Sequence, residues 1–163
     1  MLEQSDLPQA ALKSRAGEAG TTTRRVLVID DDHLHRLVIC RTAAKAGYIP
    51  AGAASCDEAA QQLRDGTFDC ITLDLSLGDH AGIEMLHRLW SIGCTAPIII
   101  ISGCDDATCS ETERVAASLK LNVWDSIPKP VDLSMLRTTL ERLKAESDGR
   151  PAGEIASPQI SPA

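Results

Sequence analysis

The stretch that decides the fold is Cys70-Ile71-Thr72-Leu73-Asp74-Leu75. Its apolar and β-branched residues are typical of a strand that is covered on both faces. Asp74 ends the apolar run, and the chain then forms a loop before a helix that begins near Gly82. A carboxylate at the carboxyl end of a parallel strand lies where open α/β sheets bind their ligands. Asp74 is therefore the first candidate for a functional residue.

Four further stretches have the character of strands, and a helix-like segment follows each of the five. These strands are predicted at 26–29, 48–53, 97–102 and 123–127. The helix after the fourth strand is predicted at about Ser110 to Leu119, because Ser110 and Glu113 have the spacing of a capping box. Strands that alternate with helices predict an α/β fold with a doubly wound, five-stranded parallel sheet.

The composition favours one globular domain with two tails. Hydrophobic residues make up 44% of the chain and charged residues 24%, which is ordinary for a globular protein. We expect a folded domain over residues 24–146, since both ends of the chain lack a sustained apolar period. Residues 1–23 and 147–163 are then predicted to be flexible N-terminal and C-terminal tails.

Charge and hydropathy argue against two classes of partner. The net charge of -7, without a basic cluster, argues against a nucleic-acid-binding surface. The apolar runs are too short to span a membrane, and the N-terminus lacks the pattern of a signal peptide. We therefore expect no nucleic-acid or membrane partner and a cytoplasmic location. The six cysteines contain no C-x-x-C pair and are predicted to be reduced thiols.

Polar residues follow four of the predicted strands in a chemically coherent order. Asp30 and Asp31 follow the first strand, Asp74 the third, Ser102 the fourth and Lys129 the fifth. Because the carboxyl ends of parallel strands lie on one edge of the sheet, we expect these side chains to gather there. A single polar strand end would mean little, whereas four that suit one reaction indicate a site.

This set of residues suits phosphoryl transfer. A carboxylate nucleophile forms an acyl phosphate, and a Mg²⁺ ion held by carboxylate and carbonyl oxygens offsets the negative charge. Lys129 would pair with one phosphoryl oxygen and the Ser102 hydroxyl with another. The acidic run 30–32 also has a simpler interpretation, in which it is a solvated loop and Asp32 caps the next helix.

Four segments closely resemble the signatures of the receiver domain of bacterial response regulators: Val26-Leu27-Val28-Ile29-Asp30-Asp31, Leu73-Asp74, Ile101-Ser102-Gly103 and Lys129-Pro130. The resemblance covers about residues 24–146 and implies the flavodoxin-like (βα)5 receiver fold. It also implies partners, namely a sensor histidine kinase or a histidine phosphotransfer protein and a downstream protein target. A homodimer is a further possibility.

The resemblance assigns a metal site to the acidic residues. Asp30 and Asp31 would be the acidic pair that serves Mg²⁺, with Asp31 a direct ligand. Asp74 would be a further ligand, together with the backbone carbonyl of Ser76.

The resemblance also assigns the reacting residues. Asp74 would be the phospho-acceptor and Lys129 the phosphoryl-binding lysine, with a cis bond to Pro130. Ser102 would be the hydroxyl that reorients on phosphorylation.

Several positions depart from the family pattern. Gly78 and Ala81 replace the usual Pro and Asp after the acceptor, and Ser126 stands where many receivers carry an aromatic residue. Trp124 lies two residues earlier and is expected on the same face of its strand as Ser126. Parts of the chain weakly resemble receivers joined to cyclic-di-GMP phosphodiesterase domains, although we expect no such output domain here.

The leading functional hypothesis is a stand-alone, single-domain response regulator, a signalling module rather than an enzyme. It would accept a phosphoryl group on Asp74 from a phosphohistidine and then change conformation and partner. One alternative is a receiver-like interaction module that no longer needs phosphorylation. Another is an aspartyl-nucleophile phosphatase, which is disfavoured because Ser76 stands where that class carries a second Asp.

Overall fold

The computed structural model describes residues 23–76, 81–103 and 106–149. Within these ranges five strands and five helices alternate along the chain. The strands are β1 (Arg24–Ile29), β2 (Tyr48–Ala53), β3 (Cys70–Asp74), β4 (Ile98–Ser102) and β5 (Val123–Pro128). The helices are α1 (His33–Lys45), α2 (Cys56–Asp65), α3 (Ala81–Ser91), α4 (Asp106–Ser118) and α5 (Leu133–Asp148).

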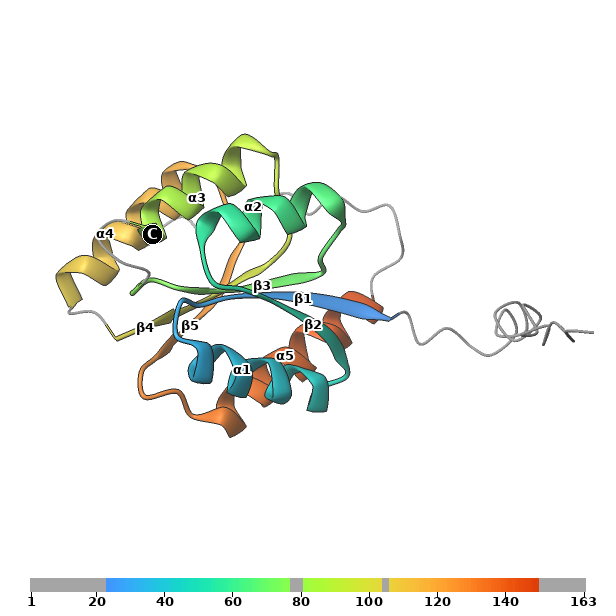
Figure 1. The fold of residues 1–163 in the computed structure, drawn as a ribbon. Helices are drawn as coiled ribbons and strands as arrows, with labels where there is room; N and C mark the ends of the chain where they lie inside the picture. The colour runs from blue at the N-terminus through green and yellow to red at the C-terminus, as the bar shows by residue number, and fades with distance from the viewer. Residues whose placement is uncertain (1–22, 77–80, 104–105, 150–163) are drawn as a thin grey trace, which may run out of the picture.

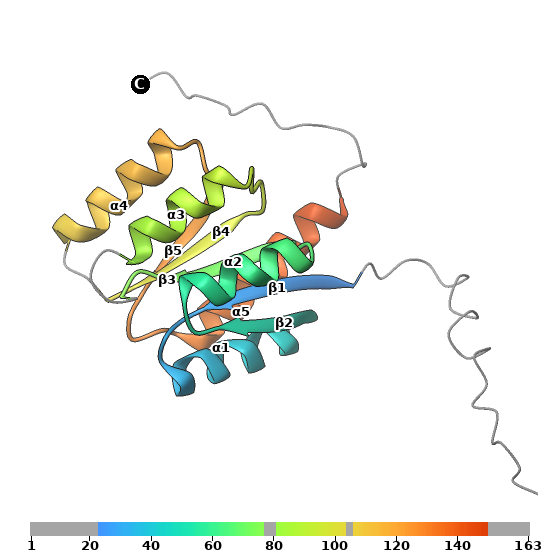
Figure 2. The ribbon, with the colours of Figure 1, turned by 45° about the horizontal axis from the view of Figure 1, so that its top comes forward.

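The strands form one parallel sheet in the order β2-β1-β3-β4-β5. Helices α1 and α5 cover one face of the sheet, and α2, α3 and α4 cover the other (Figures 1 and 2). The predicted doubly wound, flavodoxin-like α/β fold is therefore confirmed. The direction of winding reverses at β1 and β3, and such a switch point opens a crevice at the carboxyl ends of these two strands.

The central strands are buried on both faces of the sheet, which explains why their sequences are continuous apolar runs. Every residue of β3 and of β4 is buried. Along β4, Ile99 and Ile101 pack into the core beneath α1 and α5, whereas Ile98 and Ile100 pack into the core beneath α2, α3 and α4. The alternation follows the two-residue period of a strand. It determines the face of the sheet on which the side chain at the end of each strand lies.

Side-chain caps begin three of the helices. The carboxylate of Asp32 accepts a hydrogen bond from the backbone N–H of His35, and Asp132 caps α5 in the same way. Ser55 accepts from the backbone N–H of Glu58 at the start of α2. Each cap satisfies donors that the first turn of a helix leaves unpaired.

The predicted start of the fourth helix was wrong. Helix α4 begins at Asp106, so the backbone is already helical before Ser110. Ser110 and Glu113 therefore lie inside the helix. Residues three apart face one another along any helix, and this spacing alone does not identify a cap.

Strand β5 contains an irregularity that the sequence pattern did not reveal. Ile98 pairs with Val123, but Ile99 pairs with Asp125, so the register shifts by one residue. Trp124 is the additional residue, as in a β-bulge.

The bulge separates Trp124 from Ser126. Trp124 packs against the core beneath α1 and α5, whereas Ser126 lies in register with Ile100, which belongs to the opposite core. The expectation that Trp124 and Ser126 share a face was therefore wrong, because the bulge interrupts the two-residue period on which it relied.

The predicted tails lie largely outside the described residues, as does Gly78. Helix α5 continues to Asp148, where the carboxylate pairs with Arg24 at the start of β1. Among the described residues, no helix combines the length and the apolar character needed to cross a membrane. Among the described cysteine side chains, Cys40, Cys70 and Cys94 are free thiols.

The central position of β4 generates a stability prediction. Ile100 is 1% exposed, whereas Ile49 on the edge strand β2 is 52% exposed. We expect Ile100→Ala to lower the free energy of unfolding by about 2–5 kcal/mol, because it leaves a cavity beneath α2, α3 and α4. The matched substitution Ile49→Ala should cost less than about 1 kcal/mol. Urea unfolding of both variants measures the difference, and equal losses would contradict this account of the core.

Candidate functional site

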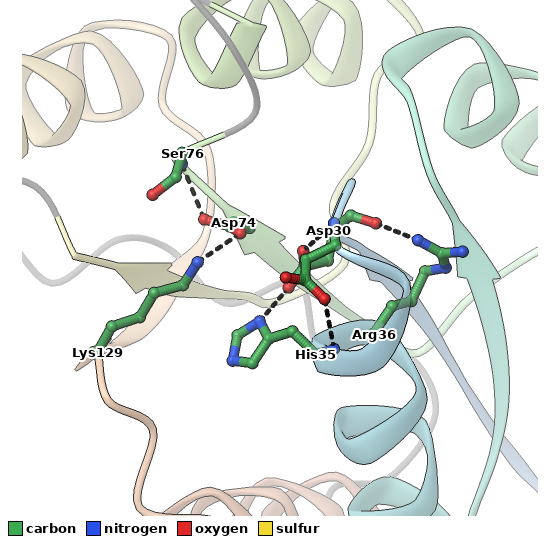
Figure 3. A network of polar contacts seen from close by, with 7 residues as sticks. Asp30, His35, Arg36, Asp74, Ser76 and Lys129 are labelled. Atoms are coloured by element: carbon green, nitrogen blue, oxygen red, sulfur yellow. Dashed lines mark hydrogen bonds and ion pairs between the residues drawn. The ribbon is translucent and has the colours of Figure 1, made fainter.

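The carboxylate of Asp74 lies at the carboxyl end of β3, 1% exposed to solvent. Its Oδ2 accepts a hydrogen bond of 2.7 Å from Nζ of Lys129, and its Oδ1 accepts one of 2.8 Å from the backbone N–H of Ser76 (Figure 3). Charge-assisted hydrogen bonds of this kind hold a carboxylate in a fixed orientation.

Lys129 reaches Asp74 from two strands away because the chain crosses the end of β4. The backbone N–H of Lys129 donates to the carbonyl of Ser102 at 2.9 Å. A Cβ placed on Gly103 would lie 3.3 Å from Cβ of Lys129, so the glycine leaves room for the lysine stem. The side chain then extends over the strand ends toward the carboxylate, as Figure 3 shows.

Asp30 provides a second buried carboxylate beside Asp74. It directly follows β1, is fully buried, and accepts a hydrogen bond of 2.9 Å from the backbone N–H of Asp32. Its other oxygen contacts Nδ1 of His35. Arg36 donates to the backbone carbonyl of Asp30 at 2.6 Å, which fixes the first turn of α1 against the end of β1.

The two carboxylates influence each other electrostatically. Burial is the main cause that raises the pKa of Asp30; the hydrogen bond from His35 opposes this rise, and the negative charge of Asp74 adds to it. A charge that is both desolvated and close to a like charge is costly to keep ionised. The site therefore gains from any cation that reaches the space between the carboxylates.

Comparison with known proteins identifies the family. The model of the response regulator receiver domain matches residues 26–141. The chain belongs to the response regulator receiver domain family. A curated relative, the transcriptional regulatory protein ZraR of Escherichia coli K12, is 29% identical over 122 residues. That match covers 75% of this chain but only 26% of the relative, so the chain spans about a quarter of the length of the curated relatives it matches.

Solved structures of receiver domains share the fold. A CheY-like response regulator receiver domain protein from Methanospirillum hungatei is 20% identical, with a TM-score of 0.67 over 78% of this chain and 98% of that one. A response regulator protein from Burkholderia pseudomallei, solved with a phosphorylated aspartic acid, a calcium ion and citrate, is 24% identical. Its TM-score is 0.60 over 77% of this chain and 71% of that one.

The receiver fold brings most of the expected site residues to one edge of the sheet. Asp30 and Asp74 end neighbouring strands, and Lys129 joins them through its ion pair. Ser102 is buried at the end of β4, one position beyond the partner of Asp74 in the strand register. Asp31 is exposed at the rim, outside the cluster of close ligand atoms that Asp30 and Asp74 form. The expected cis bond between Lys129 and Pro130 is present.

His35 is the site residue that the sequence interpretation missed. It lies in the first turn of α1, and its ring nitrogen contacts Asp30 rather than solvent alone. The available signal was the cap, because Asp32 fixes the backbone of the residue three positions later. The direction of the His35 ring from that position depends on the conformation of the loop between β1 and α1. A pattern of residue types in the sequence does not predict this direction.

The receiver site fits a divalent cation. One ligand atom each from Asp30, His35 and Asp74 lie within 4.8 Å of one another, and two of these groups are buried carboxylates. At the usual bond lengths of Mg²⁺, adjacent ligands of an octahedral ion are about 3 Å apart and opposite ligands about 4.2 Å apart. The cluster is therefore of the size that one ion needs, provided that the direct contact between His35 and Asp30 opens.

The ion pair generates a stability prediction. In metal-free buffer, Lys129→Met should lower the free energy of unfolding by about 1–3 kcal/mol, because Asp74 is left buried without its charged donor. Lys45→Met, at an exposed position of α1, should change it by less than about 0.5 kcal/mol.

A double-mutant cycle isolates the contribution of the pair. Adding Asp74→Asn to Lys129→Met should restore part of the loss, with a coupling of about 0.5–3 kcal/mol in urea unfolding. Strict additivity of the two single substitutions would show that the ion pair does not couple these residues.

Proposed function

We propose that this receiver domain accepts a phosphoryl group on Asp74 from a phosphohistidine and that the modified domain binds a downstream protein target. The phosphohistidine would belong to a sensor histidine kinase or a histidine phosphotransfer protein. The observation that carries the proposal is the oriented, buried Asp74 carboxylate with Lys129 at 2.7 Å and a second carboxylate beside it. Structural likeness to a receiver solved with a phosphorylated aspartic acid supports it.

The residues present support each part of the reaction. An oxygen of the Asp74 carboxylate attacks phosphorus, the bond between phosphorus and the histidine nitrogen breaks, and the nitrogen keeps the electron pair. Lys129 can leave the carboxylate and pair with a phosphoryl oxygen, and the Ser102 hydroxyl can donate to another. The product is an acyl phosphate on Asp74.

The proposed cofactor is Mg²⁺, held by Asp30, Asp31 and Asp74 and by the carbonyl of Ser76. When bound, the ion offsets the charges of the carboxylates and of the incoming phosphoryl group. Asp30 and Asp74 already face one another, whereas the Asp31 side chain would have to turn inward from the rim. Receiver domains are signalling modules, and we propose that this chain has no catalytic turnover on an external substrate.

The phosphodonor must contact the rim of the site, since its histidine has to reach Asp74. Next to His35 and Lys129 lies a groove of about 510 Å³ whose apolar wall includes Leu34 and Leu133. Leu34 is 70% exposed and Leu133 41% exposed, which is costly for a free surface but suits a partner with apolar residues around its phosphohistidine. We propose that the phosphodonor protein docks on this groove.

Phosphorylation of Asp74 is the first functional prediction. With Mg²⁺ and a small phosphodonor, the domain should gain one acid-stable, base-labile phosphoryl group, detected by mass spectrometry. Asp74→Asn should abolish it, because an amide is a poor nucleophile. The matched substitution Asp65→Asn, at an exposed position of α2, should not change it. Labelling of Asp74→Asn at the wild-type rate would refute the assignment.

Docking generates a second functional prediction. Leu34→Asp should slow phosphoryl transfer from a phosphorylated kinase at least about tenfold relative to transfer from a small phosphodonor, because a charge would replace an apolar anchor. Ile92→Asp, at a position that is 50% exposed after α3, should leave this ratio unchanged. Rapid-quench assays with both donors measure the ratio. An equal loss with both donors would place Leu34 in the chemistry instead of the docking surface.

The bulge in β5 generates a prediction about the conformational change. Ser102 lies on the face of the sheet beneath α2, α3 and α4, by alternation from Ile101, and Trp124 packs on the other face. Reorientation of the Ser102 hydroxyl should therefore leave the environment of Trp124 little changed. Tryptophan emission of a Trp90→Phe variant reports Trp124 alone. A large shift on phosphorylation that Ser102→Ala abolishes would assign the switch to Trp124.

Among the residues that the structure describes, no observation supports the phosphatase alternative. Ser76, which stands where that class would need its second carboxylate, donates its backbone N–H to Asp74. An interaction module without phosphorylation would not require the contact of 2.7 Å between Lys129 and Asp74. Hydrolysis of a phosphoester by the domain without any kinase would revive the enzyme hypothesis.

A further inference from the structure

We propose that the acidic site of this receiver domain prefers a divalent transition-metal ion such as Mn²⁺ or Co²⁺ over Mg²⁺, with Nδ1 of His35 as a ligand beside the carboxylates of Asp30 and Asp74. The inference concerns the same site as the proposed function and depends on that site binding a metal. It adds a nitrogen ligand to a set of oxygens and thereby changes which ion is bound most tightly.

The first step is the position of the imidazole. His35 belongs to the first turn of α1, and its backbone N–H donates to the capping carboxylate of Asp32 at 2.9 Å. From this fixed backbone the ring turns back toward the end of β1, where Nδ1 meets Oδ2 of Asp30 (Figure 3). Asp30 is in turn held by the backbone N–H of Asp32. The imidazole is therefore oriented toward the carboxylates before any ion binds.

The second step is the size of the cluster. The ligand atoms of Asp30, His35 and Asp74 lie within 4.8 Å of one another. Transition-metal bonds to imidazole nitrogen and carboxylate oxygen are about 2.0–2.2 Å long, so two ligands of one ion lie about 3–4 Å apart. An ion that enters between His35 and Asp30 would replace their direct contact and bind both. The His35 side chain is 24% exposed, which leaves the site open to solvent for entry of the ion.

The third step is ligand chemistry. Mg²⁺ prefers oxygen ligands and keeps several waters, so an imidazole adds little to its binding. Imidazole suits transition metals, and for a given site the affinity rises from Mn²⁺ through Fe²⁺ and Co²⁺ to Ni²⁺. Two buried carboxylates and one imidazole therefore favour a transition-metal ion over Mg²⁺.

Two other histidines are matched controls. His33 lies in the same turn of α1, is exposed, and contacts Arg36 instead of the carboxylates. His87 is exposed on α3. Neither belongs to the cluster of close ligand atoms among the described residues. If surface histidines bound the metal nonspecifically, substitution of His33 or His87 would weaken binding as well.

The experiment uses the full chain, unphosphorylated and freed of metal. Isothermal titration with Mg²⁺, Mn²⁺ and Co²⁺ should give a Co²⁺ dissociation constant at least about tenfold below that for Mg²⁺. His35→Gln should weaken Co²⁺ binding by about tenfold or more and bring the Co²⁺ and Mg²⁺ constants closer together. His33→Gln and His87→Gln should leave both constants within about twofold of wild type.

Spectroscopy tests the ligand directly. Electron spin echo envelope modulation of bound Mn²⁺ should show the ¹⁴N signature of a coordinated imidazole, which His35→Gln should remove. The inference would be overturned if the wild type bound Mg²⁺ and Co²⁺ with equal affinity or if the nitrogen signature were missing. It would also be overturned if His87→Gln weakened Co²⁺ binding as much as His35→Gln does.

The outcomes for the metal and for the function are separable. If Asp74 is phosphorylated with Mg²⁺ but no preference for Co²⁺ is found, the inference on His35 fails and the proposed function stands. If the metals bind as predicted but Asp74 gains no phosphoryl group with any of them, the proposed function fails while the metal assignment stands.

Discussion

The ion pair between Asp74 and Lys129 is the interaction on which the rest of the site depends. Asp74 and Asp30 are buried side by side, and within the described residues the Lys129 ammonium pairs with Asp74 at 2.7 Å. Two desolvated carboxylates repel each other strongly in a low-dielectric surrounding. The fold tolerates the arrangement because the lysine offsets one charge, while backbone N–H groups and His35 satisfy oxygens of both carboxylates.

The sheet topology creates this constraint and also makes it useful. Because β1 and β3 are neighbours, the residues that follow their apolar runs come together at one edge, and the loop after β5 brings Lys129 across the end of β4. Two carboxylates share one lysine there among the described residues, and this excess of acidic groups favours the approach of a cation. The same imbalance that costs stability thus supports the proposed chemistry.

The sequence predicts the elements whose signals are local. Asp74 and Lys129 were expected at one edge of the sheet, where the structure places them, because each follows an apolar strand and strand ends of a parallel sheet share an edge. The bulge at Trp124 was missed because every residue of 123–127 is compatible with a regular strand, and only the pairing with β4 reveals the extra residue. The start of α4 was misplaced because the spacing of Ser110 and Glu113 occurs inside helices as well as at their caps. The contact between His35 and Asp30 depends on the direction of the His35 side chain, which the spacing of residues in the sequence does not predict.

The most direct test of the central claim is the binding of beryllium fluoride, a tetrahedral analogue of a phosphoryl group, measured by ¹⁹F NMR in the presence of Mg²⁺. If Asp74 is the nucleophile and Lys129 its phosphoryl-binding partner, the wild-type domain should show resonances of bound fluoride distinct from those of free species. Lys129→Met should weaken them, and Asp74→Asn should remove them. Bound-fluoride resonances of wild-type intensity in the Asp74→Asn variant would contradict the account.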